Sequence, residues 1–260
     1  MKLNYVILLF AFVAMATVSA QNDKPLFEKN GIKIFAATAS APFADAELSL
    51  ASPANGATLA EGKDTFNFEV KNYTLGAQTP DADQKMCANS AKGQHIHFIL
   101  DNAPYVASYN PQIAQDVKPG HHVLLAFLSR SYHESLKHKK AYVLKEFNVG
   151  SVAKDEFNEK SAHIFFSRPK GEYIGEKETK RVMLDFYLVN CNLSEKGYKV
   201  HLTVNGVEFL IAIWKPFFIE GLPMGESNIK LELVDGMGHV IPSPFNGSER
   251  TITLKPETLK

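Results

Sequence analysis

Apolar and polar residues alternate along two short segments of the chain, at 95–100 and 199–204. A period of two places every second side chain on the same face, as in a β-strand with one buried face. Turn-forming pairs that favour positive φ separate such runs, at Asp101-Asn102, Asn205-Gly206 and Asp235-Gly236. No helical pattern longer than two turns is found, so the sequence predicts an all-β protein.

The chain also contains two copies of one pattern. Cys87–Asn102 aligns with Cys191–Gly206 without a gap and shares Cys, Ser, Lys, Gly and His, and LSLASP at 48–53 recurs as IFFSRP at 164–169. Repetition of this kind indicates duplication, and short strands with regular turns in a unit of about 100 residues are typical of a β-sandwich. The segment 222–239 resembles the late strands of bacterial immunoglobulin-like domains. We therefore predict two tandem immunoglobulin-like β-sandwich domains related by internal duplication.

The predicted domains cover residues 46–150 and 162–256 and are joined by a polar linker at 151–161. Residues 21–45 show no comparable pattern and are expected to form an N-terminal extension outside both domains, and 257–260 form a short tail. Residues 1–20 combine Lys2, a short apolar run and the small residues Val18-Ser19-Ala20, which predicts a cleaved secretory signal peptide. Because the apolar run is too short to span a bilayer, we expect a periplasmic or extracellular protein with no membrane span after cleavage.

Charge and motifs argue against two classes of function. The formal net charge is zero, so we expect no nucleic-acid partner. There is no Gly-x-Ser-x-Gly, His-Glu-x-x-His or phosphate-binding loop. Ser131–Glu134 holds nucleophile, base and acid types, but adjacent residues of a strand point to opposite faces and form no triad. We therefore expect no enzyme.

Features present in only one copy are candidates for function. The first copy alone has an insertion at 75–86, His95 in place of Lys199, a His121-His122 pair, and the segment 129–134 in place of a plain turn. In contrast, His97 and His201 match, which favours a hydrogen-bonded framework histidine at this position.

One strand of the first copy is apolar on both faces. Val123–Leu128 has no polar position, whereas the equivalent strand of the second copy alternates. We predict that Leu124, Ala126 and Leu128 are covered by the insertion, the other domain or a partner. By their position in the alternation, the histidines assigned to this covered face are His95, His97 and His122.

These histidines favour a metal site. His95 and His97 lie two residues apart, so their imidazoles share one strand face about 7 Å apart. Imidazole is a ligand for both copper and zinc, and His122 is the predicted third ligand. The alternative is that the three histidines are the polar lining of a covered sheet and bind no metal.

The two cysteines outside the signal peptide occupy matching positions. In an oxidising compartment an even number of cysteines favours a disulfide, here between Cys87 and Cys191. The alternative is two buried free thiols, one in each domain.

Segments 84–90, 93–97 and 127–135 carry a resemblance to a family of uncharacterised exported bacterial proteins that are sometimes labelled phosphopeptide-binding. That label reflects a likeness to forkhead-associated domains, in which a Ser-Arg-x-His segment supports phosphothreonine contacts. Here Ser129-Arg130 is followed by His133, one residue too late, and the upstream Gly-Arg pair is missing. The resemblance implies anionic-ligand binding through Arg130, whose guanidinium suits phosphate or carboxylate.

Taken together, the sequence predicts a non-enzymatic binding or assembly module of the cell envelope, with an unknown protein or small ligand as its partner. The predicted ligand-binding residues lie on the first domain and are Arg130, Tyr132 and His133. Copper or zinc binding through the histidines is the alternative. The aromatic cluster around Trp214, the single tryptophan, is expected either to fill the domain junction or to form a platform for carbohydrate or protein.

Overall fold

The computed structural model describes residues 24–152 and 157–257, and the predicted signal peptide lies outside them. The described chain consists almost entirely of strands, with one 3-10 helix, η1 (Ala82–Gln84), and one short α-helix, α1 (Glu176–Thr179). None of its helices is long and apolar enough to cross a membrane.

The first domain is a sandwich of two sheets. One sheet has the order β3 (Glu47–Ser52), β5 (Gly62–Lys71), β8 (Gln112–Val117). The other has the order β4 (Ala57–Leu59), β10 (Tyr142–Val149), β9 (Gly120–Ser129), β6 (His95–Leu100), β7 (Val106–Ser108). Only β4 and β10 pair in parallel. A core around Phe66, Phe98 and Phe147 fills the space between the sheets.

The second domain repeats this arrangement strand for strand. Its first sheet contains β11 (His163–Arg168), β13 (Val182–Val189) and β16 (Phe217–Glu220). Its second has the order β12 (Glu172–Ile174), β18 (Ser248–Lys255), β17 (Gly225–Val234), β14 (Lys199–Val204), β15 (Val207–Ile211). Both copies show a register shift near the end of their first strand, followed by a cis proline at Pro53 and Pro169. The prediction of duplicated immunoglobulin-like sandwiches is therefore confirmed.

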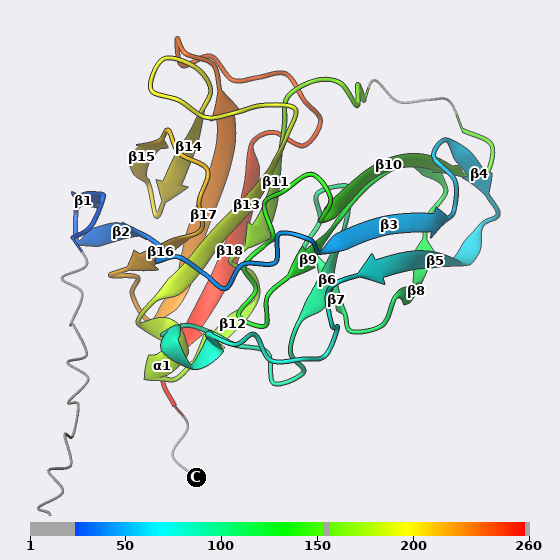
Figure 1. The fold of residues 1–260 in the computed structure, drawn as a ribbon. Coiled ribbons are helices and arrows are strands. Elements are labelled where there is room, and N and C mark those ends of the chain that lie inside the picture. Colours follow the sequence, from blue (N-terminus) through cyan, green and yellow to red (C-terminus); the bar gives the residue numbers. More distant parts are fainter. Residues whose placement is uncertain (1–23, 153–156, 258–260) are drawn as a thin grey trace, which may run out of the picture.

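The segment before the first domain belongs to the second one. Strands β1 (Phe27–Lys29) and β2 (Ile32–Ala36) form a hairpin, and β2 pairs with β16. Residues 37–45 then run back to the first domain, as the blue trace between β2 and β3 shows in Figure 1. The expectation of an extension outside both domains is thus wrong, because the alternation in Ile32–Ala36 is too short to stand out in the sequence yet completes a sheet.

The two domains share a hydrophobic core of their own. Val123, Leu125 and Phe127 of β9 pack in one cluster with Phe165 and Tyr187, from the second domain's β11 and β13. Leu124, Ala126 and Leu128 instead face the first domain's internal core. The second domain was among the groups predicted to cover the outer face of β9, and this was right. The prediction was wrong about the residues on that face, which are Val123, Leu125 and Phe127 rather than Leu124, Ala126 and Leu128. A strand buried on both sides has no alternation, so its sequence does not tell the two faces apart.

Polar contacts fix the junction as well. The Asn102 side chain donates hydrogen bonds to the Phe245 carbonyl (2.9 Å) and the Ser248 hydroxyl, and accepts one from the Phe166 amide (2.8 Å). The Lys137 ammonium pairs with the fully buried Asp185 carboxylate. A junction that buries both apolar and paired polar groups holds the domains in one arrangement.

Candidate metal site at the domain junction

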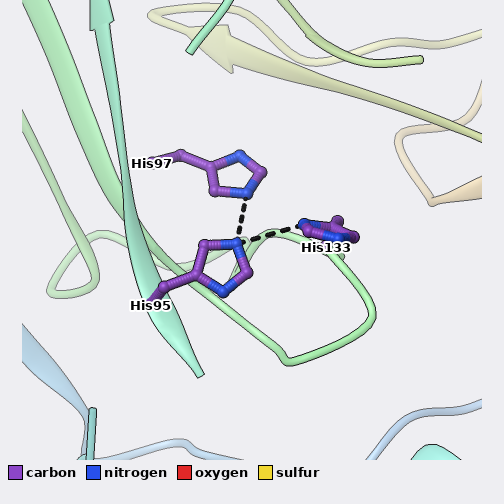
Figure 2. A group of neighbouring side chains, drawn as sticks. All are labelled: His95, His97 and His133. Carbon is purple, nitrogen blue, oxygen red and sulfur yellow. Dashed lines mark hydrogen bonds between the residues drawn. The ribbon is translucent and has the colours of Figure 1, made fainter. Parts of the chain in front are cut away.

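Three imidazoles meet at the covered face of the first domain. His95 and His97 project from β6, and His133 comes from the turn after β9 (Figure 2). The nitrogens are His95 Nε2, His97 Nε2 and His133 Nδ1, with His95 Nε2 lying 2.9 Å from His97 and 3.1 Å from His133. One ligand atom from each residue lies within 4.8 Å of the other two. A tetrahedral ion with metal–nitrogen bonds of about 2.0–2.1 Å would space its ligands by about 3.3–3.4 Å. The two pairs that include His95 are already close to this spacing, and the third pair has to close from at most 4.8 Å.

The backbone at His133 has an unusual conformation for a histidine. Its φ is 69°, in the left-handed region that glycine occupies most easily. The equivalent turn of the second domain has the same hydrogen bonds, and Gly238 with φ 90° occupies the same position. The first domain thus keeps a side chain where its own duplicate uses glycine, and such local cost is typical of functional positions.

The insertion unique to the first domain holds this turn in place. The Ser131 amide donates to the Thr79 hydroxyl (2.9 Å), and the Thr79 amide donates to the Ser131 hydroxyl (3.2 Å). Just before the insertion, the Tyr73 hydroxyl donates to the Ser129 carbonyl at the end of β9 (2.9 Å). The insertion therefore holds the turn that carries His133, without supplying a ligand atom to the group.

Neighbouring groups orient two of the three rings. His95 Nδ1 lies 2.8 Å from the Gly93 carbonyl, which only accepts, so the neutral ring carries its proton there and directs the Nε2 lone pair inward. Without metal, the unprotonated His95 Nε2 accepts a hydrogen bond from His97 Nε2 (2.9 Å). His97 can move this proton to Nδ1, where the Ser167 hydroxyl on β11 (3.1 Å) accepts it, and its Nε2 can then bind an ion. Metal-binding histidines usually have such a second partner, which fixes the tautomer.

Burial keeps all three histidines neutral. It lowers the pKa of His95 to about 4, although the hydrogen bond to Gly93 partly opposes this effect. Burial also holds the pKa values of His97 and His133 well below the ordinary value, and the cations Arg168 and Lys170 contribute in the same direction. Neutral imidazole is the form that binds metal, so no proton has to leave at neutral pH before an ion enters.

Tyr105 closes the group on one side. Its ring stacks on His97 with centroids 3.5 Å apart and an interplanar angle of 8°, and its hydroxyl lies 3.1 Å from His133 Nδ1. Burial raises the pKa of Tyr105, so the hydroxyl stays protonated and is a weak ligand. Neither Tyr105 nor Ser167 was identified from the sequence. Tyr105 reaches the group from the loop between β6 and β7, and Ser167 reaches it from the second domain, and nothing in the residue pattern marks either contact.

His122, the predicted third ligand, lies away from this group. It occupies β9 at a position whose side chain faces the first domain's internal core, and its ring lies against Phe147. Its two nitrogens are bonded to the Asp101 carboxylate and the Lys118 carbonyl, both at 2.7 Å. The prediction for His122 failed for the same reason as that for Leu124, since both rest on the wrong face of β9. His133 takes its place.

Arg130 and Tyr132, the other predicted ligand-binding residues, are bonded within the chain. The guanidinium of Arg130 contacts the Glu134 carboxylate (2.9 Å) and the Ala41 carbonyl (2.6 Å). The Tyr132 hydroxyl donates to Asp81 (3.0 Å). The guanidinium of Arg130 is therefore already bonded to Glu134 and to the segment 37–45, through the Ala41 carbonyl, and is not available to an anionic ligand.

The two cysteines form no disulfide in the structure. Cys87 lies in a buried cluster with Tyr132 and Phe218, whereas Cys191 is half-buried beside the second domain's core. Burial raises the pKa of Cys87 to about 12 and that of Cys191 to about 11, so both thiols are protonated. The predicted bridge is thus replaced by its alternative, because the duplication places the two residues in different clusters rather than beside each other.

A cleft of about 390 Å³ opens at another part of the junction. Its lining residues include Tyr142, Tyr187, Trp214, Lys137 and Lys139, and among the described residues that line it there is no acidic one. The indole N–H of Trp214 donates to the Phe186 carbonyl (2.9 Å), and its ring packs edge-on against Tyr187. Trp214 therefore both fills the junction and lines the cleft.

Comparison with known proteins gives only remote likenesses. No model of a protein family matches the chain, and no curated protein is similar enough to count as a match. Fibronectin(III)-like modules of Clostridium thermocellum CbhA are 12% identical, with a TM-score of 0.28, over 80% of this chain and 94% of theirs. The Ig1-2 module of the Drosophila receptor tyrosine phosphatase DLAR is 9% identical, with a TM-score of 0.25, over 80% and 99%. The Bacteroides ovatus protein SGBP-B, solved with a mixed-linkage heptasaccharide, is 11% identical, with a TM-score of 0.24, over 80% and 47%. At these scores none of the likenesses carries an argument about this chain.

Proposed function

We propose that this protein is a non-enzymatic metal-binding module of the cell envelope that holds one copper or zinc ion through His95, His97 and His133. The location outside the cytoplasm is part of the proposal and rests on the signal-like residues 1–20. The positions of the three histidines support the choice of ligands. The second domain, where Gly238 and His201 occupy the places of His133 and His97, shows the same scaffold without the group.

The observation that carries the proposal is the convergence of three neutral imidazole nitrogens within 4.8 Å, one of them at a backbone position where the duplicate has glycine. The matching His201 of the second domain lies near Glu208 and Glu232 instead of beside other imidazoles. Three protein ligands and an unfilled fourth position are typical of copper and zinc sites that exchange their ligand or ion.

The test is metal binding by residues 21–260 after treatment with a chelator. We expect one equivalent of Zn(II), or of Cu(I) under reducing conditions, to bind with a Kd below about 1 µM and to raise the melting temperature. His133→Gly introduces the residue of the duplicate, so the turn is retained while one ligand is lost, and the affinity should fall at least about 100-fold.

Two control variants separate the site from the other histidines. His122→Asn changes the ligand that the sequence predicted, and His201→Asn changes the matching residue of the second domain. Both should bind metal as the wild type does. Loss of binding in these variants but not in His133→Gly, or no binding by the wild type, would refute the proposal.

A second candidate function is supported by the cleft at Trp214. The partly exposed rings of Tyr142 and Trp214 offer stacking surfaces, and the exposed Lys139 favours an anion, whereas Lys137 is already paired with Asp185. The ligand class is therefore an acidic saccharide. Trp214 is the single tryptophan, and its fluorescence reports on this cleft alone. Titration with oligogalacturonate should change the emission, neutral cello-oligosaccharides should not, and Tyr142→Ala should abolish the response. A flat titration with both sugars would remove this candidate.

A further inference from the structure

The second domain places positive charge behind the three histidines. Lys170 Nζ lies 3.8 Å from the centroid of the Tyr105 ring, whose other face is taken by His97 at 3.5 Å. Because a parallel stack leaves no room on the His97 side, the ammonium lies on the far face of Tyr105, roughly 7 Å from the His97 ring. It is held there by a hydrogen bond to the Tyr105 carbonyl (2.6 Å).

Arg168 adds a second charge. Its guanidinium carbon lies 5.6 Å from the Tyr105 centroid, the residue is 8% exposed, and Nη1 donates to the Tyr173 hydroxyl (2.8 Å). Arg250, also 8% exposed, donates to the carbonyls of Ser167 and Phe166 rather than to an acid. Within the described ranges, no carboxylate forms an ion pair with any of these three cations. The positive charge beside the site is therefore not cancelled locally.

The ligands of the ion carry no negative charge either. The group contains three imidazoles and no carboxylate or thiolate. Copper and zinc sites with divalent ions often include an anionic ligand or acquire hydroxide, which reduces the charge of the complex. In this site no ligand reduces the charge of the ion, and the ring of Tyr105 lies between His97 and the cations Lys170 and Arg168.

Resting on the proposed function, we infer that this site selects the monovalent ion Cu(I) over divalent Zn(II) because of the positive charges of Lys170 and Arg168 beside it. The repulsion between a fixed cation and the bound ion scales with the ion's charge, so it penalises Zn(II) twice as much as Cu(I). Three neutral nitrogen ligands satisfy Cu(I), whereas Zn(II) would still lack a fourth protein ligand.

The experiment compares two affinities in two charge variants. Kd values for Cu(I) and Zn(II) are measured at pH 7 and low salt for the wild type, Lys170→Met and Lys170→Arg. Lys170→Met should improve Zn(II) affinity about tenfold more than Cu(I) affinity, and Lys170→Arg should keep the wild-type ratio. Lys196→Met removes the same charge from an exposed loop and should leave the ratio unchanged. Raising the salt concentration should narrow the wild-type difference between the two ions.

The outcomes separate the two proposals. If the wild type binds neither ion, the proposed function fails and this inference fails with it. If both ions bind but Lys170→Met shifts their affinities equally, only the charge selection is refuted. Thermal unfolding of the metal-free variants checks that the domain junction is retained in each of them.

Discussion

Two equivalent sheet faces of this molecule have opposite environments. On β9 the outward face carries Val123, Leu125 and Phe127, and the second domain covers it. On β17, aligned with β9 from the first glycine of each strand, the same positions carry Asn228, Lys230 and Glu232 and are only half-buried. The strands of the two domains are arranged in the same way, so the difference in burial arises because the second domain packs on the outer face of β9.

The framework histidine shows what this difference does. His97 and His201 occupy the third position of β6 and β14, yet His97 is fully buried beside two other imidazoles and His201 is half-buried near carboxylates. Under the proposed function, His97 is an exception to the rule that features shared by both copies are structural. The same residue type at equivalent positions thus has different surroundings, because only His97 lies under the other domain.

The largest expected effect comes from removing a side chain of β9 that packs against the second domain. Phe127→Ala should lower the free energy of unfolding by about 3–5 kcal/mol, because a fully buried ring that stacks on Tyr187 leaves a cavity in the junction. The matched change on the exposed face, Glu232→Ala, should cost less than about 0.5 kcal/mol. Denaturant unfolding of both variants measures the difference, and similar losses in the two would show that the junction contributes little.

A pH profile of the metal-free protein tests the burial of the imidazoles. The folded-state pKa of His95, about 4, lies below that of the unfolded chain, so folding favours the neutral ring. Its contribution is complete above about pH 6.5 and is lost as the pH falls toward 4, which amounts to about 3 kcal/mol. His97 and His133 act in the same direction.

The variant His95→Gln should flatten this part of the profile, measured as unfolding free energy between pH 7 and pH 4. Lys199→Gln, the change at the equivalent position of the second domain, removes no imidazole and should keep the wild-type slope. An unchanged slope in His95→Gln would contradict the burial of this ring.

Two equivalent turns, at Asn102 after β6 and at Gly206 after β14, can be exchanged to measure how much the Asn102 side chain stabilises the junction. Asn102 and Gly206 are equivalent, and both have positive φ (55° and 79°), so Asn102→Gly keeps the backbone but removes three hydrogen bonds across the junction. The loss also leaves the Phe166 amide without its acceptor, and the expected cost is about 2–3 kcal/mol. In Gly206→Asn the added Cβ meets nothing within 4 Å, and asparagine tolerates a positive φ better than most residues, so thermal unfolding should show only a small loss.

The fold was largely predictable because strand patterns are local. Alternation at 95–100 and 199–204 and the repeated Cys-to-Gly segment identified equivalent strands before any contact was known. The hairpin of β1 and β2 was missed, because its pairing with β16 joins residues about 180 positions apart and has no local signal.

The site was only partly predictable for the same reason. His95 and His97 follow from one strand, but His133 reaches them through a turn, Tyr105 through the loop after β6, and Ser167 across the domain junction. A signal for His133 was present in the alignment of the two copies, since Glu134 and His239 close the same turn and place His133 opposite Gly238. Without the backbone angles, that pairing of histidine with glycine had no evident meaning.

The smallest effect tests the cost of placing histidine in this turn. Gly238→His gives the second domain the residue of the first at φ 90°, where an added Cβ meets nothing within 4 Å. The only penalty is the left-handed backbone, so the unfolding free energy should fall by about 1 kcal/mol, and metal stoichiometry should stay at one because Lys199 stands where His95 would be needed. A neutral result would mean that histidine is tolerated there without cost, and the backbone of His133 would then no longer support a functional role. A loss near 1 kcal/mol would mean that the first domain keeps its histidine against a measurable penalty, as expected for a ligand.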